Sequence, residues 1–375
     1  MAASTFKTIS DNDIVSTRTL LHEAIPLTGS IVSGTYSENN IKFHTHGMFQ
    51  TVYDYPYLSS SANHIFDITV GTGVKSGNHS VSQNQYKKKK NIYNQMAQVM
   101  VGYDTTGSIL QFDADGNILA GGDKLDNVFV IPFSRLLVKD EIKKESFSME
   151  LGVSSSTNYG DKFVFHDRIS ITDKGAKSSY FVNSPAGEYG ILYATASHQK
   201  GAANLLKADG DHAVGLIYYQ AGIVVLSGSV FNDEADGGII HNDSGSCKFF
   251  DSTFASAAIT SSLDQALVNH TIKDVGNNFR SRIYNISFNN TTELNSTIYF
   301  CRVNHSEFNY SSNPTYLSSS QIIVKDSNPQ AVPISYITTI GLYSPNNELM
   351  AVAKLSEPLK KTPSNEFTLR VRLDY

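Results

Sequence analysis

The second half of this chain is a series of short apolar runs separated by turn residues, and this pattern constrains the fold more than any other feature. In the clearest run, Phe367, Leu369, Val371 and Leu373 alternate with polar residues. A period of two is typical of a strand with one buried face. Many such runs between Gly, Asp, Asn and Pro turns favour antiparallel all-β structure. The sequence therefore predicts a mainly β, sandwich-like fold of two antiparallel β-rich units, with a few short helices and an N-terminal arm.

The predicted strands are rich in Val, Ile, Phe and Tyr and are separated by turn residues. They are 30–36, 126–133, 147–151, 163–171, 179–182, 189–194, 214–231, 297–303, 336–343, 348–355 and 366–373. Residues Asp113 to Asn117 lie between two apolar runs and predict a hairpin or tight turn.

Few helices are predicted. Ser10 with Asp13 predicts a cap for an N-terminal helix that carries Leu20 and Leu21. A second helix is expected over 91–101, just after a run of four lysines, with Gly102 as its end. A short helix capped by Ser134 is expected to carry Leu136, Leu137 and Ile142, with Lys143 and Lys144 in its last turn. Another is expected after Ser262, which forms a capping box with Gln265.

These elements suggest three parts. Residues 1–45 are an N-terminal arm that packs on a neighbouring subunit. Residues 46–235 are a β-rich domain with short helices, and residues 236–375 are a C-terminal β-sandwich-like domain with a helical insertion. On this division, removing residues 1–30 would block assembly and leave the fold intact.

Charge and targeting signals limit the classes of binding partner and the cellular locations that are expected. Charged residues make up 17% of the chain, and the net charge is −5. This balance gives no general attraction for nucleic acid or for an anionic membrane. No secretory signal or membrane span is expected. Two cysteines, Cys247 and Cys301, are too few for a disulfide framework and are expected to be buried thiols.

No catalytic or nucleotide-binding motif is found, so the chain is predicted to be non-enzymatic and to need no cofactor. His44 and His46 are the candidate metal ligands, with His22 and His64 to complete a site. The alternative is that they are ordinary hydrogen-bonding histidines. Asp113, Asp115, Asn117 and Asp123 resemble part of a calcium loop, but the hairpin interpretation fits their spacing better.

The candidate interface residues are the apolar pair of the arm, the lysine run and the basic end of the last strand. The lysine run is either a solvated face or a contact for an acidic partner. These residues are Leu20, Leu21, Lys87, Lys88, Lys89, Lys90, Arg370, Arg372 and Tyr375.

Several longer segments resemble one group of proteins. They are Thr17–Pro26, Asn91–Gln98, Phe133–Lys144, Phe288–Arg302, Tyr336–Leu355 and Phe367–Tyr375. These segments are similar to virion structural proteins of T4-like, contractile-tailed bacteriophages, especially the cyanophage and marine phage group. The resemblance spans nearly the whole chain, and no catalytic residues are carried over from that group.

The resemblance implies a tail or baseplate protein that bridges neighbouring subunits. Its partners would be other phage structural proteins, and it would be a homo-oligomer or a multi-copy component of a symmetric particle, with no nucleic acid and no membrane. It would be assembled in the cytoplasm of the bacterial host and reside in the virion. The alternatives are a neck or capsid-surface (decoration) protein, or a receptor- or glycan-binding tail protein.

Overall fold

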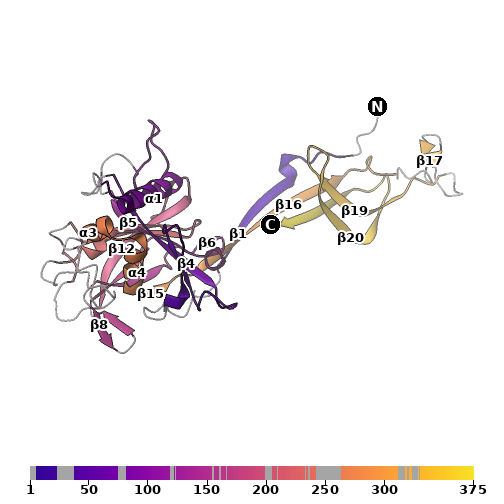
Figure 1. The fold of residues 1–375 in the computed structure, drawn as a ribbon. Helices are drawn as coiled ribbons and strands as arrows, with labels where there is room; N and C mark the ends of the chain where they lie inside the picture. The colour runs from indigo at the N-terminus through magenta and orange to yellow at the C-terminus, as the bar shows by residue number, and fades with distance from the viewer. Residues whose placement is uncertain are drawn as a thin grey trace. The chain divides into compact units, whose positions relative to one another are not determined.

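The structure is a computed structural model of residues 1–375 (Figure 1). It describes 6–22, 38–74, 82–118, 122, 124–153, 156–159, 162–165, 167–198, 205–208, 210–232, 234, 237–241, 263–310, 317–318, 321–322, 328 and 330–375. The predicted strand at 30–36, Asp123 and Cys247 lie outside these residues. Side chains are not described for 20–22, 38, 156–165, 198, 317 and 321–322.

The chain divides into two compact units. The larger unit is Leu21–Thr292, and the smaller unit combines Met1–Leu20 with Glu293–Tyr375. Both boundaries fall inside strands, namely β1 (Ile14–His22) and β16 (Asn290–Val303). This division differs from the predicted boundary at 235/236 and from the separate arm at 1–45.

Packing of the helical segment explains the later boundary. Helices α3 (Leu263–Asn269) and α4 (Ile272–Arg282) and strand β15 (Ile283–Ser287) all belong to the larger unit. Phe279 of α4 stacks on Phe129 with ring centroids 4.4 Å apart. The larger unit therefore includes these elements, and its boundary lies after them, at Thr292.

The larger unit is built on an eleven-stranded sheet, which confirms the mainly β, sandwich-like prediction. Its order is β15-β7-β10-β12-β13-β14-β5-β4-β3-β2, with β11 paired to β12, and every described pairing is antiparallel. The bounds are β2 (Ile41–Phe43), β3 (Gln50–Tyr53), β4 (His64–Thr72), β5 (Asn127–Pro132), β7 (Ser148–Gly152), β10 (Arg168–Thr172), β11 (Phe181–Ser184), β12 (Gly187–His198), β13 (His212–Tyr218) and β14 (Ile223–Ser227). Shorter pieces are β6 (Glu141–Ile142), β8 (Ser156–Tyr159) and β9 (Lys162–Phe165).

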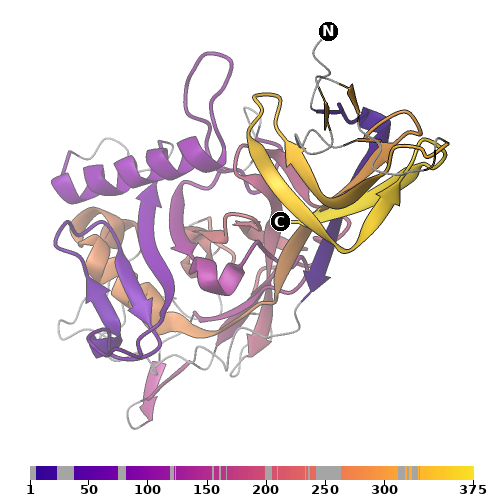
Figure 2. The same ribbon diagram turned by 90° about the vertical axis from the view of Figure 1, so that its right-hand side faces the viewer.

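Two apolar cores lie on opposite faces of this sheet. In β5, Phe129 and Ile131 enter the core that contains α3 and α4, whereas Val128 and Val130 enter the core that contains α1. Burial on both faces explains why this strand reads as a continuous apolar run and not as an alternating one. Helix α1 (Asn84–Met100) packs on β4 (Figure 2).

Three helix predictions need correction. The N-terminal helix is wrong, because a short 3-10 turn at Asp11–Asp13 leads directly into β1. Helix α1 begins at Asn84 and not at 91, so all four lysines lie inside it. Helix α4 follows α3 and was not predicted, although Thr271 and Asp274 form a capping box at its start. The helix after Ser134 is confirmed in part. Helix α2 (Arg135–Val138) is there, but Ile142 lies in β6 and the Ser134 side chain makes no capping hydrogen bond.

The smaller unit consists of a sheet of order β1-β16-β21 and separate hairpins. Strand β21 (Phe367–Asp374) pairs antiparallel with β16. Strands β19 (Ser335–Tyr343) and β20 (Leu349–Lys361) form a long hairpin, and β17 (Leu317–Ser318) pairs with β18 (Gln321–Ile322). Among the described residues of this unit, Val303 and Val371 are its only buried apolar side chains. Its apolar core is therefore very small.

One buried amide in the larger unit leads to a stability prediction. The side chain of Gln50 is 2% exposed, and neither its Nε2 nor its Oε1 has a hydrogen-bond partner among the described residues. It lies against α4, since a Cβ atom at Gly276 would be 2.7 Å from Nε2. Gln50→Met is expected to raise the free energy of unfolding by about 1–2 kcal/mol, because it replaces an unsatisfied polar side chain with an apolar one of similar volume. Urea unfolding followed by far-UV circular dichroism measures this, and a less stable variant contradicts it.

Candidate functional site

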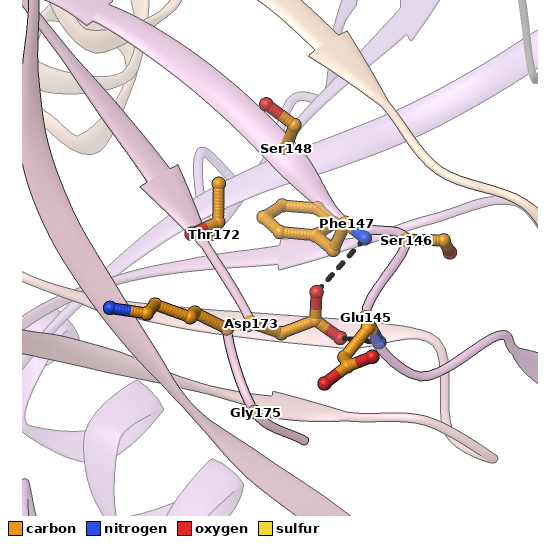
Figure 3. A pocket seen from close by; sticks show the side chains of 8 residues that line it. Glu145, Ser146, Phe147, Ser148, Thr172, Asp173 and Gly175 are labelled. Carbon is orange, nitrogen blue, oxygen red and sulfur yellow. Dashed lines mark hydrogen bonds between the residues drawn. The ribbon is translucent and has the colours of Figure 1, made fainter. Parts of the chain in front are cut away.

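A pocket of about 360 Å³ lies between the loop after β6 and the end of β10. Its lining residues are Glu145, Ser146, Phe147, Ser148, Thr172, Asp173, Lys174 and Gly175 (Figure 3). The buried carboxylate of Asp173 accepts hydrogen bonds from the backbone N–H groups of Glu145 (2.7 Å) and Phe147 (3.1 Å). It also accepts one from the Tyr219 hydroxyl at 3.1 Å. Burial raises the pKa of Asp173, and these hydrogen bonds oppose that rise.

This arrangement anchors a loop. Glu145 has φ +62, in the left-handed region, and its N–H is held there by Asp173. Lys177 pairs with the Glu145 carboxylate at 2.9 Å on the surface. The donors to Asp173 are two backbone N–H groups of the loop after β6 and the hydroxyl of buried Tyr219. The carboxylate therefore holds that loop in place and is not available to the pocket as a free base.

His44 and His46 lie together, but as a stacked pair. Their ring centroids are 5.2 Å apart with an interplanar angle of 5°, and Phe49 contacts both rings. His44 Nε2 is 3.0 Å from Thr51 Oγ1, and His46 Nδ1 accepts from the Met48 N–H. Burial lowers the pKa of His44, as do His46 and Lys42.

The expected completion of a metal site is not seen. His64 instead hydrogen-bonds Asp67 at 3.1 Å, which raises its pKa, and the side chain of His22 is not described. Across the described part of the chain, no group of three or more His, Cys, Asp or Glu residues could hold a metal ion. The geometry of His44 and His46 is that of histidines that hydrogen-bond within a turn. Asp113 forms an isolated bridge and an ion pair with Lys124, so this bridge closes beyond the tight turn that was predicted at Asp113 to Asn117.

The lysine run does not act as one surface. Lys87 and Lys88 are exposed and Lys90 is half-buried, but Lys89 is completely buried. Its Nζ donates to the carbonyl oxygens of Leu267 (2.5 Å) and His270 (2.6 Å), at the end of α3. A cation at the C-terminal end of a helix is favourable. The solvated interpretation is therefore wrong for Lys89, and this residue is not an interface candidate.

Lys89 makes a pH-dependent contribution to stability. Burial lowers its pKa to about 8, although Asp274 acts in the opposite direction. Above pH 8 the unfolded chain still binds this proton and the folded chain loses it, so stability rises with pH. Through Lys89 alone, the free energy of unfolding is expected to increase by roughly 1.5 kcal/mol between pH 8 and pH 9.5. Denaturant unfolding of wild type and Lys89→Met at both pH values tests it, and equal pH slopes contradict it. Unfolded tyrosines also begin to ionise in this range, but their effect is common to both chains and cancels in the comparison with Lys89→Met.

The N-terminal segment is tied to its own chain. Asp13 pairs with Arg302 at 2.7 Å, Ser16 with Thr297 at 3.2 Å, and Arg18 with Glu293 at 2.5 Å. Lys7 also pairs with Glu307. The partner numbers fall as the N-terminal numbers rise, as in antiparallel strands. Strand β1 of the predicted arm therefore forms part of the sheet that contains β16 and β21. The side chains of Leu20 and Leu21 lie outside the described residues.

The last strand is the alternating element that was predicted. Its apolar residues are buried or half-buried, while Arg370 and Arg372 are exposed. Arg372 contacts Asp374 (2.7 Å) and Ser296 (3.1 Å). Tyr375 is 73% exposed, but its backbone N–H donates to the Asn295 carbonyl at 2.8 Å. Arg370 and Tyr375 thus remain available as interface residues.

Exposed apolar side chains gather on the β19–β20 hairpin. Tyr336 is 62% exposed and Met350 is 70% exposed, and Tyr343, Leu349 and Val352 are each about half exposed. On the other face, Ile337 and Ile340 are only half-buried. The two strands of this hairpin were predicted at 336–343 and 348–355 and are confirmed. Their exposed apolar side chains were not among the predicted interface residues. Cys301, which was expected to be buried, is half-exposed in β16.

A second exposed feature is the loop that connects β3 to β4. Asp54 accepts hydrogen bonds from the N–H groups of Tyr55 (2.8 Å) and Asn63 (2.6 Å), and from Asn63 Nδ2 (2.9 Å). Burial raises the pKa of Asp54, but these hydrogen bonds outweigh it and the pKa is lowered. The fixed loop presents Tyr55, Tyr57 and Leu58, which is 85% exposed. It has the Tyr- and Ser-rich composition of a preorganised contact surface.

In the described part of the chain, no helix is both long enough and apolar enough to cross a membrane. Comparisons of the whole chain with protein-family models, with curated proteins and with solved structures find no match.

Proposed function

We propose that this chain is a non-enzymatic structural protein of a contractile-tailed phage virion, in the tail or baseplate, where it bridges neighbouring subunits. One observation carries the proposal. The smaller unit buries only Val303 and Val371 among its described apolar residues and exposes large apolar side chains on a hairpin. Exposed apolar patches of this kind mark interaction sites in soluble proteins.

Other features support the same conclusion. In the pocket described above, the Asp173 carboxylate is hydrogen-bonded to the backbone of the loop after β6. The low content of charged residues suits a surface that is covered by protein neighbours, and the segments quoted above resemble virion proteins. The neck and the capsid surface are the competing locations within this class.

Fractionation of virions tests the proposal. Particles of the phage that encodes this chain are separated into heads and tails, and each fraction is probed with an antibody raised against the purified chain. The signal is expected in the tail fraction. Signal confined to heads would favour the neck or capsid surface, and absence from both fractions would overturn the virion proposal.

The loop after β3 favours a second candidate function, recognition of a receptor or glycan by a tail protein. Tyr55 and Tyr57 form a fixed aromatic surface whose single charge, on Asp54, is satisfied within the loop. Aromatic faces of this kind suit stacking on neutral ligands. Binding to a glycan array that is lost in Tyr55→Ala supports this function, and no binding by the wild-type chain argues against it.

A further inference from the structure

We propose that strand β1 pairs edge to edge with β1 of a second copy of this chain, so that the two copies share one continuous sheet across a two-fold axis. This inference rests on the proposed function, because it names one of the neighbours that the chain would bridge. The surface concerned, called here the β1 edge, is the side of residues 14–20 that faces away from β16.

The β1 edge is open. In its sheet, β1 pairs with β16 on one side and with no described strand on the other. Every residue from Ile14 to Thr19 is exposed, although successive side chains of a strand point to opposite faces of its sheet. The described chain therefore buries neither face of this part of β1. An unpaired edge of this kind presents a row of backbone N–H and C=O groups to another strand.

The β1 edge also lacks the devices by which proteins protect a strand edge. Residues 14–20 contain no proline, glycine or lysine, and their one charged side chain, Arg18, pairs with Glu293 at 2.5 Å. At the opposite end of the sheet, β21 carries Arg370 and Arg372, which repel a second copy of the same strand. The eleven-stranded sheet ends in β2 and β15, which are only three and five residues long. The β1 edge is therefore the one suited to strand addition in its own sheet.

The chemistry of this edge fits a second copy of itself. Its exposed residues other than Arg18 are uncharged, so a charged partner strand would find no counter-charge here. Ser16, Thr17 and Thr19 offer hydroxyl groups, and pairs of Thr and Ser across antiparallel strands stabilise a sheet. Two identical strands that run antiparallel exchange N–H···O=C bonds symmetrically, as the isologous contacts of a two-fold interface must.

Arg18 determines the register of the pairing. Strands paired symmetrically about Arg18 would place two arginines opposite each other. Pairing about Thr17 avoids this contact, and it places Val15 opposite Thr19 of the second copy and Ser16 opposite Arg18. It also uses residues 14–20, which are the part of β1 that belongs to the smaller unit. Val15 and Thr19 are four positions apart in the strand, so they lie on the same face of the sheet.

Charge substitution tests this pairing. The full chain is examined by analytical ultracentrifugation from about 1 to 100 µM, where wild type is expected to form a concentration-dependent dimer. Val15→Lys with Thr19→Lys places like charges opposite one another twice, and it is expected to raise the dissociation constant about tenfold or more. Val15→Lys with Thr19→Glu places opposite charges in the same two pairs, and it is expected to bind at most about threefold more weakly than wild type.

A matched control and a second readout separate pairing from other effects. Thr338→Lys with Thr368→Lys adds the same charge at exposed positions outside β1, and it is expected to dimerise as wild type does. Hydrogen exchange needs no variant. In wild type, amides of β1 should exchange more slowly at the high end of the concentration range than at the low end, because pairing protects those that face the free edge.

Three outcomes overturn the inference. They are a wild-type chain that stays monomeric, a double-lysine variant that dimerises like the control, and a lysine–glutamate variant that is as weak as the double-lysine variant. Far-UV circular dichroism of each variant shows that the fold is retained. A chain that is present in tails but monomeric leaves the proposed function standing and removes only this partner. A dimer that responds to the substitutions but is absent from virions does the opposite.

Discussion

Gly190→Ala is expected to lower the free energy of unfolding of the larger unit by about 3 kcal/mol. A Cβ atom at position 190 would lie 2.3 Å from the Tyr219 hydroxyl oxygen and 3.2 Å from Cζ. The Tyr219 ring is completely buried, and its hydroxyl donates to Asp173. The ring therefore cannot move away without breaking that bond and disturbing the loop that Asp173 anchors. Urea unfolding followed by far-UV circular dichroism measures the loss.

Tyr219→Phe provides the control, because it removes the atom that causes the clash. Alone it is expected to cost about 1–2 kcal/mol through the lost bond to Asp173. Combined with Gly190→Ala it is expected to cost at least 1 kcal/mol less than the sum of the single variants. Thr195→Ser, at an exposed position of the same strand, should change stability by less than about 0.5 kcal/mol. Strictly additive costs would mean that the contact between positions 190 and 219 is absent.

Elements with a strong local pattern were predictable from the sequence. Strand β21 follows directly from alternation over eight residues, and α1 follows from its apolar stripe. The start of α1 and the burial of Lys89 were also readable, because Tyr86, Lys89 and Tyr93 recur at helical spacing on the buried face. Lys89 thus belongs to the buried stripe of α1 and not to the exposed charge of Lys87 and Lys88.

The N-terminal helix was wrong because a distant partner decides its structure. The cap at Ser10 is real, since its side chain accepts a hydrogen bond from the Asn12 N–H. However, Ile14, Val15 and Thr17 are β-branched and favour a strand. Their pairing with β16 closes a loop of about 280 residues, which no local signal reveals. Helix α4, in contrast, has a local capping signal in the sequence, at Thr271 and Asp274.

The candidate sites were less predictable than the fold. The sequence identified His44 and His46 as a pair, but not that their rings stack. It also could not show that Asp173 meets Tyr219, because these residues are brought together by non-adjacent strands. The exposure of the hairpin depends on how little the rest of the smaller unit covers it. That property belongs to the tertiary packing and not to any single run of residues.

Removal of residues 1–19 is expected to unfold the smaller unit and to leave the larger unit folded. This differs from the expectation that removing the N-terminal arm blocks assembly but leaves the fold intact. The deletion removes most of β1 and its contacts through Asp13, Ser16 and Arg18, and it exposes the edge of β16. A unit that buries only Val303 and Val371 among its described apolar residues is expected to have a small free energy of unfolding.

Hydrogen exchange distinguishes this result from a local effect. In the truncated chain, the backbone amides of β16 beyond Glu293 and of β21 should lose protection, whereas those of β5 and β14 should keep it. The matched control is Asp13→Asn with Arg18→Gln, which retains the strand. Because exposed ion pairs contribute about 0.2–1 kcal/mol each, that variant should stay folded. Full protection of β21 in the truncated chain would instead show that β16 and β21 form a stable sheet without β1, and the N-terminal segment would then be free to bind a neighbouring subunit.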